Sequence, residues 1–482
     1  MDFFKKIFNK NRSNPIARDT EKQHEKYSFE STVKAEDLIA YNAQRFNGQV
    51  KPICSAPIKD MYFSRHGFVY VCCHNRSYPV GQYPKDSIKK IWTGEKNNKI
   101  RTALSKNNLS LGCQKCQIDM DNKAYQSVRA NHFDLLPLNP DYPTMMEFEL
   151  DTTCNLECAM CSGEFSTSIR KNREKLPPLK TFYDSNFVKE LEEFIPHLKE
   201  TRFSGGEPFL IKIYLELWDK IVEHNKDCLI SVQTNGTVLN TRIKEILHKG
   251  RFEIGVSLDS LDKNTFETIR QNANFEKVIS SIHFFSEYCL QKNTAFRLSM
   301  CVLRNNWHEM GEYVEFCNKL NAYASFHKVI NPEKEAIWCL SSKELNKIYQ
   351  TLSNYNFGDT TSLNSIALQN IEHFQQYLKQ IKIWAQNQEK YEIEKGVFEN
   401  ITTAEMKSEF IKDIFREAEN QNLFKEEIAG IHEKLTSVLK KQPEDKQRNT
   451  ILKLKKYNNK VILQSLTLKS VEELQKELSN LG

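Results

Sequence analysis

Three cysteines lie close together in the segment DTTCNLECAMC, at Cys154, Cys158 and Cys161, with the spacing C-x3-C-x2-C. Three thiolates in one short loop can bind three irons of a 4Fe–4S cluster, whereas a fully ligated cluster usually takes four cysteines. The spacing therefore predicts a cluster with one open iron, much as a catalytic zinc site keeps an open position. The alternatives are a zinc site completed by a distant ligand and three buried structural cysteines.

Further candidate binding residues follow the next predicted strands and the helix after them: Gly205, Gly206, Glu207, Asn235, Ser257 and Arg270. In FSGGEPF, the two glycines let the backbone approach a ligand closely, and the carboxylate can accept from an ammonium group. Arginine suits a carboxylate because its planar fork donates two parallel hydrogen bonds. The ordinary alternatives are turns for GGEP and Asn-Gly, and a solvated helix residue for the arginine.

A second set of cysteines precedes the first and consists of Cys54, Cys72, Cys113 and Cys116. The first two follow the pattern C-x12-G-x4-C around Gly67, and the last two form C-x2-C. A zinc ribbon is one interpretation of these spacings. Cys73 is an alternative ligand or a buried bystander. We expect most other cysteines to be core residues, and consider that three residues can face a substrate: Cys301, Cys339 and His327.

The cysteine loop and the GGEP segment, in this order, resemble the radical S-adenosylmethionine superfamily. The resemblance implies that Cys154, Cys158 and Cys161 hold the cluster, whose open iron is chelated by the amino and carboxylate groups of S-adenosylmethionine. It implies that GGEP binds the methionine amino group, while Ser257 and Arg270 contact the ribose and the carboxylate. The family often has an aromatic residue before the third cysteine, where this chain has Met160.

The earlier cysteines resemble the SPASM/twitch auxiliary domain in its short form. This resemblance implies a second 4Fe–4S cluster held by Cys54, Cys72, Cys113 and Cys116. The region around Trp92 also matches. In the family this domain usually follows the barrel, whereas here it precedes it, which leaves open how the second cluster approaches the active site.

Strands and helices alternate around these motifs. Six predicted strands span 147–151, 201–204, 229–234, 253–259, 296–302 and 325–329. Between them, residues 186–195 form a typical amphipathic helix, with Ser185 as its expected cap and Pro196 ending it. Six such units are too few to close an eight-fold barrel, so we expect an α/β fold with an open, partial (β/α)6 barrel.

We expect an N-terminal tail at 1–45, a cysteine-rich twitch-like domain at 46–135 and a proline-rich linker at 136–143. The partial barrel then covers residues 144–340, and a helical region covers residues 341–482. The helical region carries few chemically distinctive residues, so we interpret it as a cap or recognition layer.

Composition excludes several classes. The 482 residues include 68 basic and 62 acidic side chains, a net charge of +6 that is too small to indicate nucleic acid binding. Hydrophobic residues make up 39%, as in globular proteins, and no apolar run reaches the ~18 residues of a transmembrane helix. The N-terminus lacks a secretory signal, so the thirteen cysteines indicate the reducing cytoplasm.

The resemblance implies cleavage of S-adenosylmethionine to a 5′-deoxyadenosyl radical, which abstracts hydrogen from a substrate carbon. It implies an electron donor such as flavodoxin or ferredoxin. The auxiliary cluster suits a net oxidation, and similar enzymes mostly modify peptides or proteins. The alternatives are oxidation or epimerisation of a sugar, aminocyclitol or other small metabolite, and a non-enzymatic zinc-binding interaction protein.

Overall fold

The computed structural model describes residues 33–45, 52–399, 401–420, 423, 425–440, 442–455, 459–468, 470–472 and 474–475. The chain divides into two compact units. One contains Glu30–Leu340 with Leu345–Lys382, and the other contains Ser341–Glu344 with Ile383–Gly482. Most of the predicted tail lies outside the described residues, but its residues 35–43 form a helix, α3 (Ala35–Ala43).

A nine-stranded sheet, counted over the described residues, organises the first unit in the order β3-β2-β1-β4-β5-β6-β7-β8-β9. Its parallel strands β4 to β9 are Met145–Glu149, Glu200–Phe203, Leu229–Thr234, Arg251–Ser257, Phe296–Val302 and Tyr323–Lys328. All six strands predicted from the sequence are present, each within two residues of its expected bounds. The expected partial barrel of six parallel strands is therefore confirmed.

The cysteine-rich segment continues the same sheet. Strand β1 (Asp60–Ser64) pairs in parallel with β4, and β2 (Phe68–Tyr70) and β3 (Gly81–Gln82) follow antiparallel. The segment also contains α4 (Ile88–Thr93), α5 (Glu95–Ser105), α6 (Gln114–Asp121) and α7 (Ala130–Asp134). Because β1 lies directly beside β4, the two cysteine sets belong to one compact unit.

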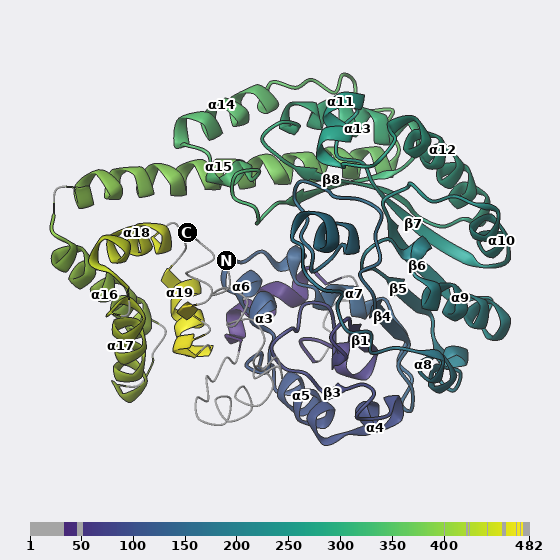
Figure 1. Ribbon diagram of the computed structural model, residues 1–482, viewed down its shortest axis with the longest axis horizontal. Coiled ribbons are helices and arrows are strands. Elements are labelled where there is room, and N and C mark those ends of the chain that lie inside the picture. Colours follow the sequence, from purple (N-terminus) through teal and green to yellow (C-terminus); the bar gives the residue numbers. More distant parts are fainter. Residues whose placement is uncertain are drawn as a thin grey trace. The chain divides into compact units, whose positions relative to one another are not determined.

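Helices cover one face of the parallel strands, as Figure 1 shows for α8 (Ser185–Leu191), α9 (Lys212–His224), α10 (Thr241–Lys249) and α12 (Phe275–Lys292). Phe203 of β5 packs against Tyr214 and Trp218 of α9, with ring centroids 4.9 and 5.4 Å apart. The cap expected at Ser185 is wrong. Asp184 accepts from the first amides of α8 instead, because Ser185 is itself helical.

Helices α13 (Met310–Lys319) and α14 (Ser342–Ser353) belong mainly to the first unit, and α15 (Ser365–Glu399) crosses the boundary between the units. The second unit continues with α16 (Thr403–Asn420), α17 (Lys425–Lys440), α18 (Glu444–Leu454) and α19 (Asn459–Leu468), around an apolar core of its own. Across the part of the chain that the structure describes, no helix has the length and apolarity needed to cross a membrane.

Candidate functional site

The three cysteines of the C-x3-C-x2-C motif lie in the loop that leaves the carboxyl end of β4. Cys158 is buried, and Cys154 and Cys161 are partly exposed. The pKa of the Cys158 thiol is raised to about 12, chiefly by burial and also by Asp259, Cys161 and Cys154, against the lowering effect of Arg270. The structure thus places the three cysteines in one partly exposed loop at the carboxyl ends of the parallel strands.

The GGEP segment after β5 is fastened to this loop through backbone hydrogen bonds. The amide of Gly206 donates to the carbonyl of Asp151 at 3.2 Å, and the amide of Glu207 donates to Thr153 at 2.7 Å. A Cβ atom at Gly206 would stand 2.2 Å from the Thr153 carbonyl oxygen, and Gly205 has a φ of +131°. Both glycines are therefore required for the close approach of the two loops.

The carboxylate of Glu207 is fully buried and points toward the end of β6. Its oxygens accept from the Thr234 hydroxyl at 2.6 Å, the Asn235 amide at 2.7 Å and the Phe209 amide at 3.1 Å. Burial raises its pKa, against the lowering effect of these donors. Its side chain therefore joins the ends of β5 and β6.

Asn235 and Ser257 lie at the ends of β6 and β7. The Asn235 amide group donates to Asn155 Oδ1 at 3.0 Å, and Asn155 immediately follows Cys154. The hydroxyl of Ser257 accepts from Gln233 Nε2 at 3.0 Å. The structure therefore connects Asn235 directly to the cysteine loop, while Ser257 is partly exposed at the same end of the sheet.

Arg270 is buried and forms an ion pair with Asp259, with 2.7 Å between Nε and Oδ2. The other carboxylate oxygen accepts from the Cys301 amide at 2.7 Å. Arg270 Nη1 lies 3.9 Å from Cys158 Sγ, and the carbonyl of Ile269 accepts from Ala159 in the cysteine loop. The expected arginine is thus at the three-thiol site, held by a carboxylate that was not selected from the sequence.

The four earlier cysteines line one small cavity: Cys54, Cys72, Cys113 and Cys116. The other lining side chains are apolar except Arg129. Two of the thiols accept hydrogen bonds, Cys54 from the Ala56 amide at 3.4 Å and Cys113 from Asn75 Nδ2 at 3.5 Å. In the described chain, no three His, Cys, Asp or Glu side chains converge on a single-ion site. Four thiols around a cavity fit a larger group such as a cluster.

Cys73 does not line this cavity. Its amide donates to Glu147 Oε1 at 3.1 Å. Three cysteines outside the two sites are buried core residues: Cys228, Cys289 and Cys317. Cys301 and Cys339 are only partly buried and pack, with Met160 of the cysteine loop, against one apolar cluster. These two cysteines thus lie beside the three-thiol loop.

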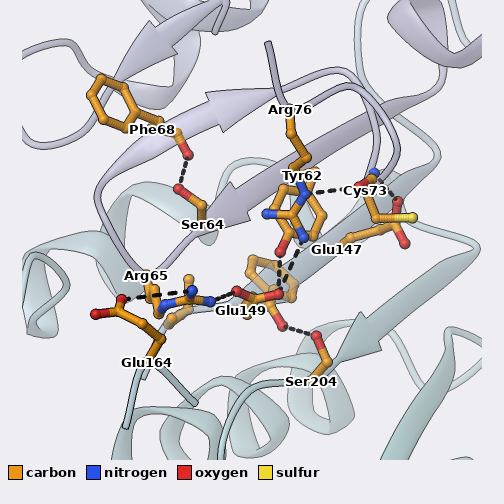
Figure 2. Close-up of polar contacts among 12 residues, drawn as sticks. Tyr62, Ser64, Arg65, Phe68, Cys73, Arg76, Glu147, Glu149, Glu164 and Ser204 are labelled. Atoms are coloured by element: carbon orange, nitrogen blue, oxygen red, sulfur yellow. Dashed lines mark hydrogen bonds and ion pairs between the residues drawn. The ribbon is translucent and has the colours of Figure 1, made fainter. Parts of the chain in front are cut away.

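Glu149, the last residue of β4, is a functional candidate that sequence reasoning missed. Figure 2 shows its carboxylate contacting Tyr62, Arg65 and Arg76 from the cysteine-rich segment. The Tyr62 hydroxyl donates at 2.6 Å and the Arg76 guanidinium at 3.2 Å. The signal was present as the alternation of Glu147 and Glu149 in a strand, which places both on the same face.

We call this face, opposite the helices, the inner face. The register of the parallel strands aligns polar residues across it in rows. Its members at or just beyond the carboxyl ends of the strands are Glu149, Ser204, Gln233, Ser257, Ser299, Cys301 and His327. The side chain of His327 is exposed, and partial desolvation by the residues around it lowers its pKa. A polar inner face beside three thiols can bind a substrate rich in hydrogen-bonding groups.

Two family models match this chain. Residues 149–317 match the radical SAM superfamily, and residues 54–117 match the iron-sulfur cluster-binding domain SPASM. The chain therefore carries a radical SAM domain, with an SPASM domain N-terminal to it. These domains imply S-adenosylmethionine, a 4Fe–4S cluster and further iron–sulfur binding, and they disfavour the alternative of a non-enzymatic zinc-binding protein.

Curated relatives match part of the chain. A GTP 3',8-cyclase of Clostridium perfringens (strain SM101 / Type A) is 29% identical over 163 residues, 33% of this chain and 47% of the relative. A probable GTP 3',8-cyclase of Methanocaldococcus jannaschii is 26% identical over 193 residues, 40% of this chain and 60% of the relative. The chain spans about half the length of these relatives.

Solved structures with similarity include native anSMEcpe with bound AdoMet and Streptococcus suis SuiB bound to S-adenosylmethionine. The first is 18% identical, with coverage of 44% of this chain and 60% of that chain and a TM-score of 0.33. The second is 16% identical, with coverage of 55% and 59% and a TM-score of 0.34.

Proposed function

We propose that this enzyme uses S-adenosylmethionine to remove hydrogen from a carbon atom of a substrate bound at the inner face. The observation that carries the proposal is the placement of three cysteines in the single loop that leaves β4, fastened by hydrogen bonds to the loop after β5 and to Ile269 beside Arg270. Cys154, Cys158 and Cys161 would hold the cluster. When bound, the cofactor and cluster together supply a radical that attacks an unactivated carbon.

The cofactor-binding wall is proposed to consist of Gly205, Gly206, Glu207, Asn235, Ser257 and Arg270. The glycines bring backbone groups close to the cysteine loop, and Ser257 presents a partly exposed hydroxyl. The charged groups of Glu207 and Arg270 are already engaged inside the protein, so we assign them to positioning the loop ends as well as to the cofactor.

The second site is proposed to hold an auxiliary 4Fe–4S cluster on Cys54, Cys72, Cys113 and Cys116. These four thiols line one cavity, and Cys73 faces away from it toward Glu147. A cluster there provides a place for the second electron of a net oxidation, which the three-thiol site alone does not.

For the substrate we propose a peptide or protein, which similar SPASM enzymes mostly modify. The polar inner face offers partners for backbone amides and carbonyls. The alternative, a small polar metabolite such as a sugar, aminocyclitol or nucleotide, is favoured by relatives named GTP 3',8-cyclase. An electron donor such as flavodoxin or ferredoxin and a reducing, cytoplasmic location complete the proposal.

Iron and sulfide content after anaerobic reconstitution tests both sites. Because each 4Fe–4S cluster contains four irons, wild type should bind about eight irons and the Cys154/Cys158/Cys161→Ala variant about four. Only wild type should cleave S-adenosylmethionine with dithionite. The matched control is the Cys228/Cys289/Cys317→Ala variant, whose buried cysteines lie outside both sites and which should keep all its iron. Iron without cleavage in wild type would refute the proposed chemistry.

Mass spectrometry separates the substrate classes. Peptides encoded beside the gene should lose about 2 Da on co-expression with the enzyme, because a net oxidation removes two hydrogens. Co-expression with the Cys154/Cys158/Cys161→Ala variant should leave the peptide masses unchanged. GTP is the probe for the alternative. Consumption of GTP together with 5′-deoxyadenosine formation, and no mass change in the peptides, would overturn the peptide proposal.

A further inference from the structure

Arg129 occupies a distinctive place in the auxiliary site. Its side chain is 13% exposed and belongs to the wall of the cavity that the four thiols line. The guanidinium carbon lies 5.4 Å from the ring centroid of Phe133, which also lines the cavity. Of the described lining residues, Arg129 alone carries a formal charge.

Glu147 fixes the orientation of this guanidinium. Arg129 Nη2 donates to Glu147 Oε2 at 3.0 Å, while the other carboxylate oxygen accepts from the Cys73 amide at 3.1 Å. Glu147 belongs to β4, the strand that leads into the three-thiol loop. The Nε atom of Arg129 is buried and has no hydrogen-bond partner among the described residues. One buried N–H therefore stays available to an acceptor.

N–H groups near the cavity favour negative charge there, as the guanidinium of Arg129 does. Arg129 and Ala130, at the start of α7, line the cavity together with Cys116. Cys54 and Cys113 accept N–H hydrogen bonds. Reduction adds negative charge to an iron–sulfur cluster, so nearby N–H groups and cations stabilise the reduced form and raise the reduction potential.

We propose that Arg129 raises the reduction potential of the auxiliary cluster, and that Glu147 is the positioning residue that holds its guanidinium against the cavity. The inference rests on the proposed function, since it requires a cluster on Cys54, Cys72, Cys113 and Cys116. A higher reduction potential favours electron transfer from the substrate to the auxiliary cluster over transfer in the opposite direction. The auxiliary site would therefore act as the electron acceptor.

The test is a redox titration followed by electron paramagnetic resonance in the Cys154/Cys158/Cys161→Ala background, which contains the auxiliary cluster alone. Arg129→Gln should lower the midpoint potential and Arg129→Lys should lower it less, because lysine keeps the charge. Glu147→Gln should raise the potential, because glutamine keeps an oxygen acceptor for the Arg129 guanidinium but removes a negative charge beside the cavity. Arg101→Gln is the matched control. Arg101 donates to the carbonyl of Pro57, stacks on Trp92 and does not line the cavity, so the cluster of this variant should keep the midpoint potential of the parent.

A lower midpoint potential for Arg129→Gln together with a higher one for Glu147→Gln would support the inference. A general disturbance of the fold would not change the potential in opposite directions in the two variants. Unchanged potentials at about four irons per chain, or shifts in the same direction, would overturn it. If Arg129→Gln loses its iron, the comparison of Arg129→Lys with Glu147→Gln carries the test. A parent variant without iron would instead refute the auxiliary cluster itself, and this inference with it.

Discussion

The buried ion pair beside the three-thiol loop gives a quantitative prediction. Asp259 has no exposed surface, and its Oδ2 lies 2.7 Å from Arg270 Nε. The change Asp259→Asn removes the charge but keeps the volume and the Oδ1 acceptor for the Cys301 amide, which now donates at 2.7 Å. The substitution therefore removes the charge and the acceptor that face Arg270 and leaves the contact with Cys301 in place.

At 2.7 Å and an effective dielectric constant of about 20, the attraction between the two charges is about 6 kcal/mol. The cost of removing both charges from water offsets much of this attraction. Removing one partner, however, leaves an uncompensated buried charge on Arg270, which typically costs about 3–5 kcal/mol. We expect Asp259→Asn to lower the free energy of unfolding by that amount.

Urea unfolding of the cluster-free protein under reducing conditions, followed by tryptophan fluorescence, measures this loss. Four of the five tryptophans lie in the same compact unit as the pair: Trp92, Trp218, Trp307 and Trp338. The double variant Asp259→Asn/Arg270→Met should regain most of the lost stability, because no buried charge remains. The matched control is Asp219→Asn, which breaks a solvent-exposed pair with Arg242 and should cost at most about 1 kcal/mol.

The reasoning would be refuted if Asp259→Asn unfolded within about 0.5 kcal/mol of wild type. It would also be refuted if the double variant were no more stable than the single one. A changed slope of free energy against urea concentration would instead indicate an altered denatured state.

Gly206→Ala should reduce iron binding at the three-thiol site, because the new Cβ would stand 2.2 Å from the Thr153 carbonyl oxygen; iron analysis in a Cys54/Cys72/Cys113/Cys116→Ala background measures this. The folding stability should also depend on pH through Glu200. Burial raises its pKa, but His132 and Arg202 outweigh burial and hold it at about 2, against an ordinary 4.5. Because this folded-state pKa is depressed, the stabilisation of about 3 kcal/mol is present above pH 4.5 and is lost as the pH falls toward 2. Glu200→Gln should therefore be less stable than wild type at pH 7, with a gap that closes on acidification; urea unfolding across this range measures it.

A matched comparison tests each of the Gly206→Ala and Glu200→Gln predictions. Gly396→Ala is the control for the glycine change, because outside its own helix no atom of the described residues lies within 4 Å of its Cβ position; full iron binding by Gly206→Ala would contradict the close approach of the two loops. For Glu200→Gln, a stability difference from wild type that stays constant between pH 7 and pH 3 would show that the carboxylate's charge contributes nothing.

Much of the three-thiol site was predictable from sequence because its determinants are local. A strand followed by a fixed cysteine spacing, and a second strand followed by two glycines, place both loops at the same edge of any parallel sheet. The six strand positions followed from their apolar runs for the same reason. Where two adjacent residues were suitable, local pattern was insufficient: Ser185 and Asp184 both make good caps, and only the backbone of α8 decides between them.

For the proposed auxiliary site, the sequence predicts a set of four cysteines but not the side chains that surround them. The cysteine spacings indicated four ligands, and the cavity contains all four. Cys72 and Cys73 are equivalent to a sequence pattern, yet in the fold Cys72 lines the cavity and Cys73 does not, and the amide of Cys73 donates to Glu147. Arg129 has no motif around it, and its importance depends on a carboxylate eighteen residues away.

The sequence by itself determined the thiols, the glycines and the strand–loop order, because spacing along the chain controls which groups share a loop. Only the tertiary structure decided their charge environment. The parallel pairing of β1 with β4 places Tyr62, Arg65 and Arg76 on Glu149, and the fold pairs Arg270 with Asp259 beside Cys158. Charges interact through space rather than along the chain, so these pairings follow from packing and are not encoded in any local pattern.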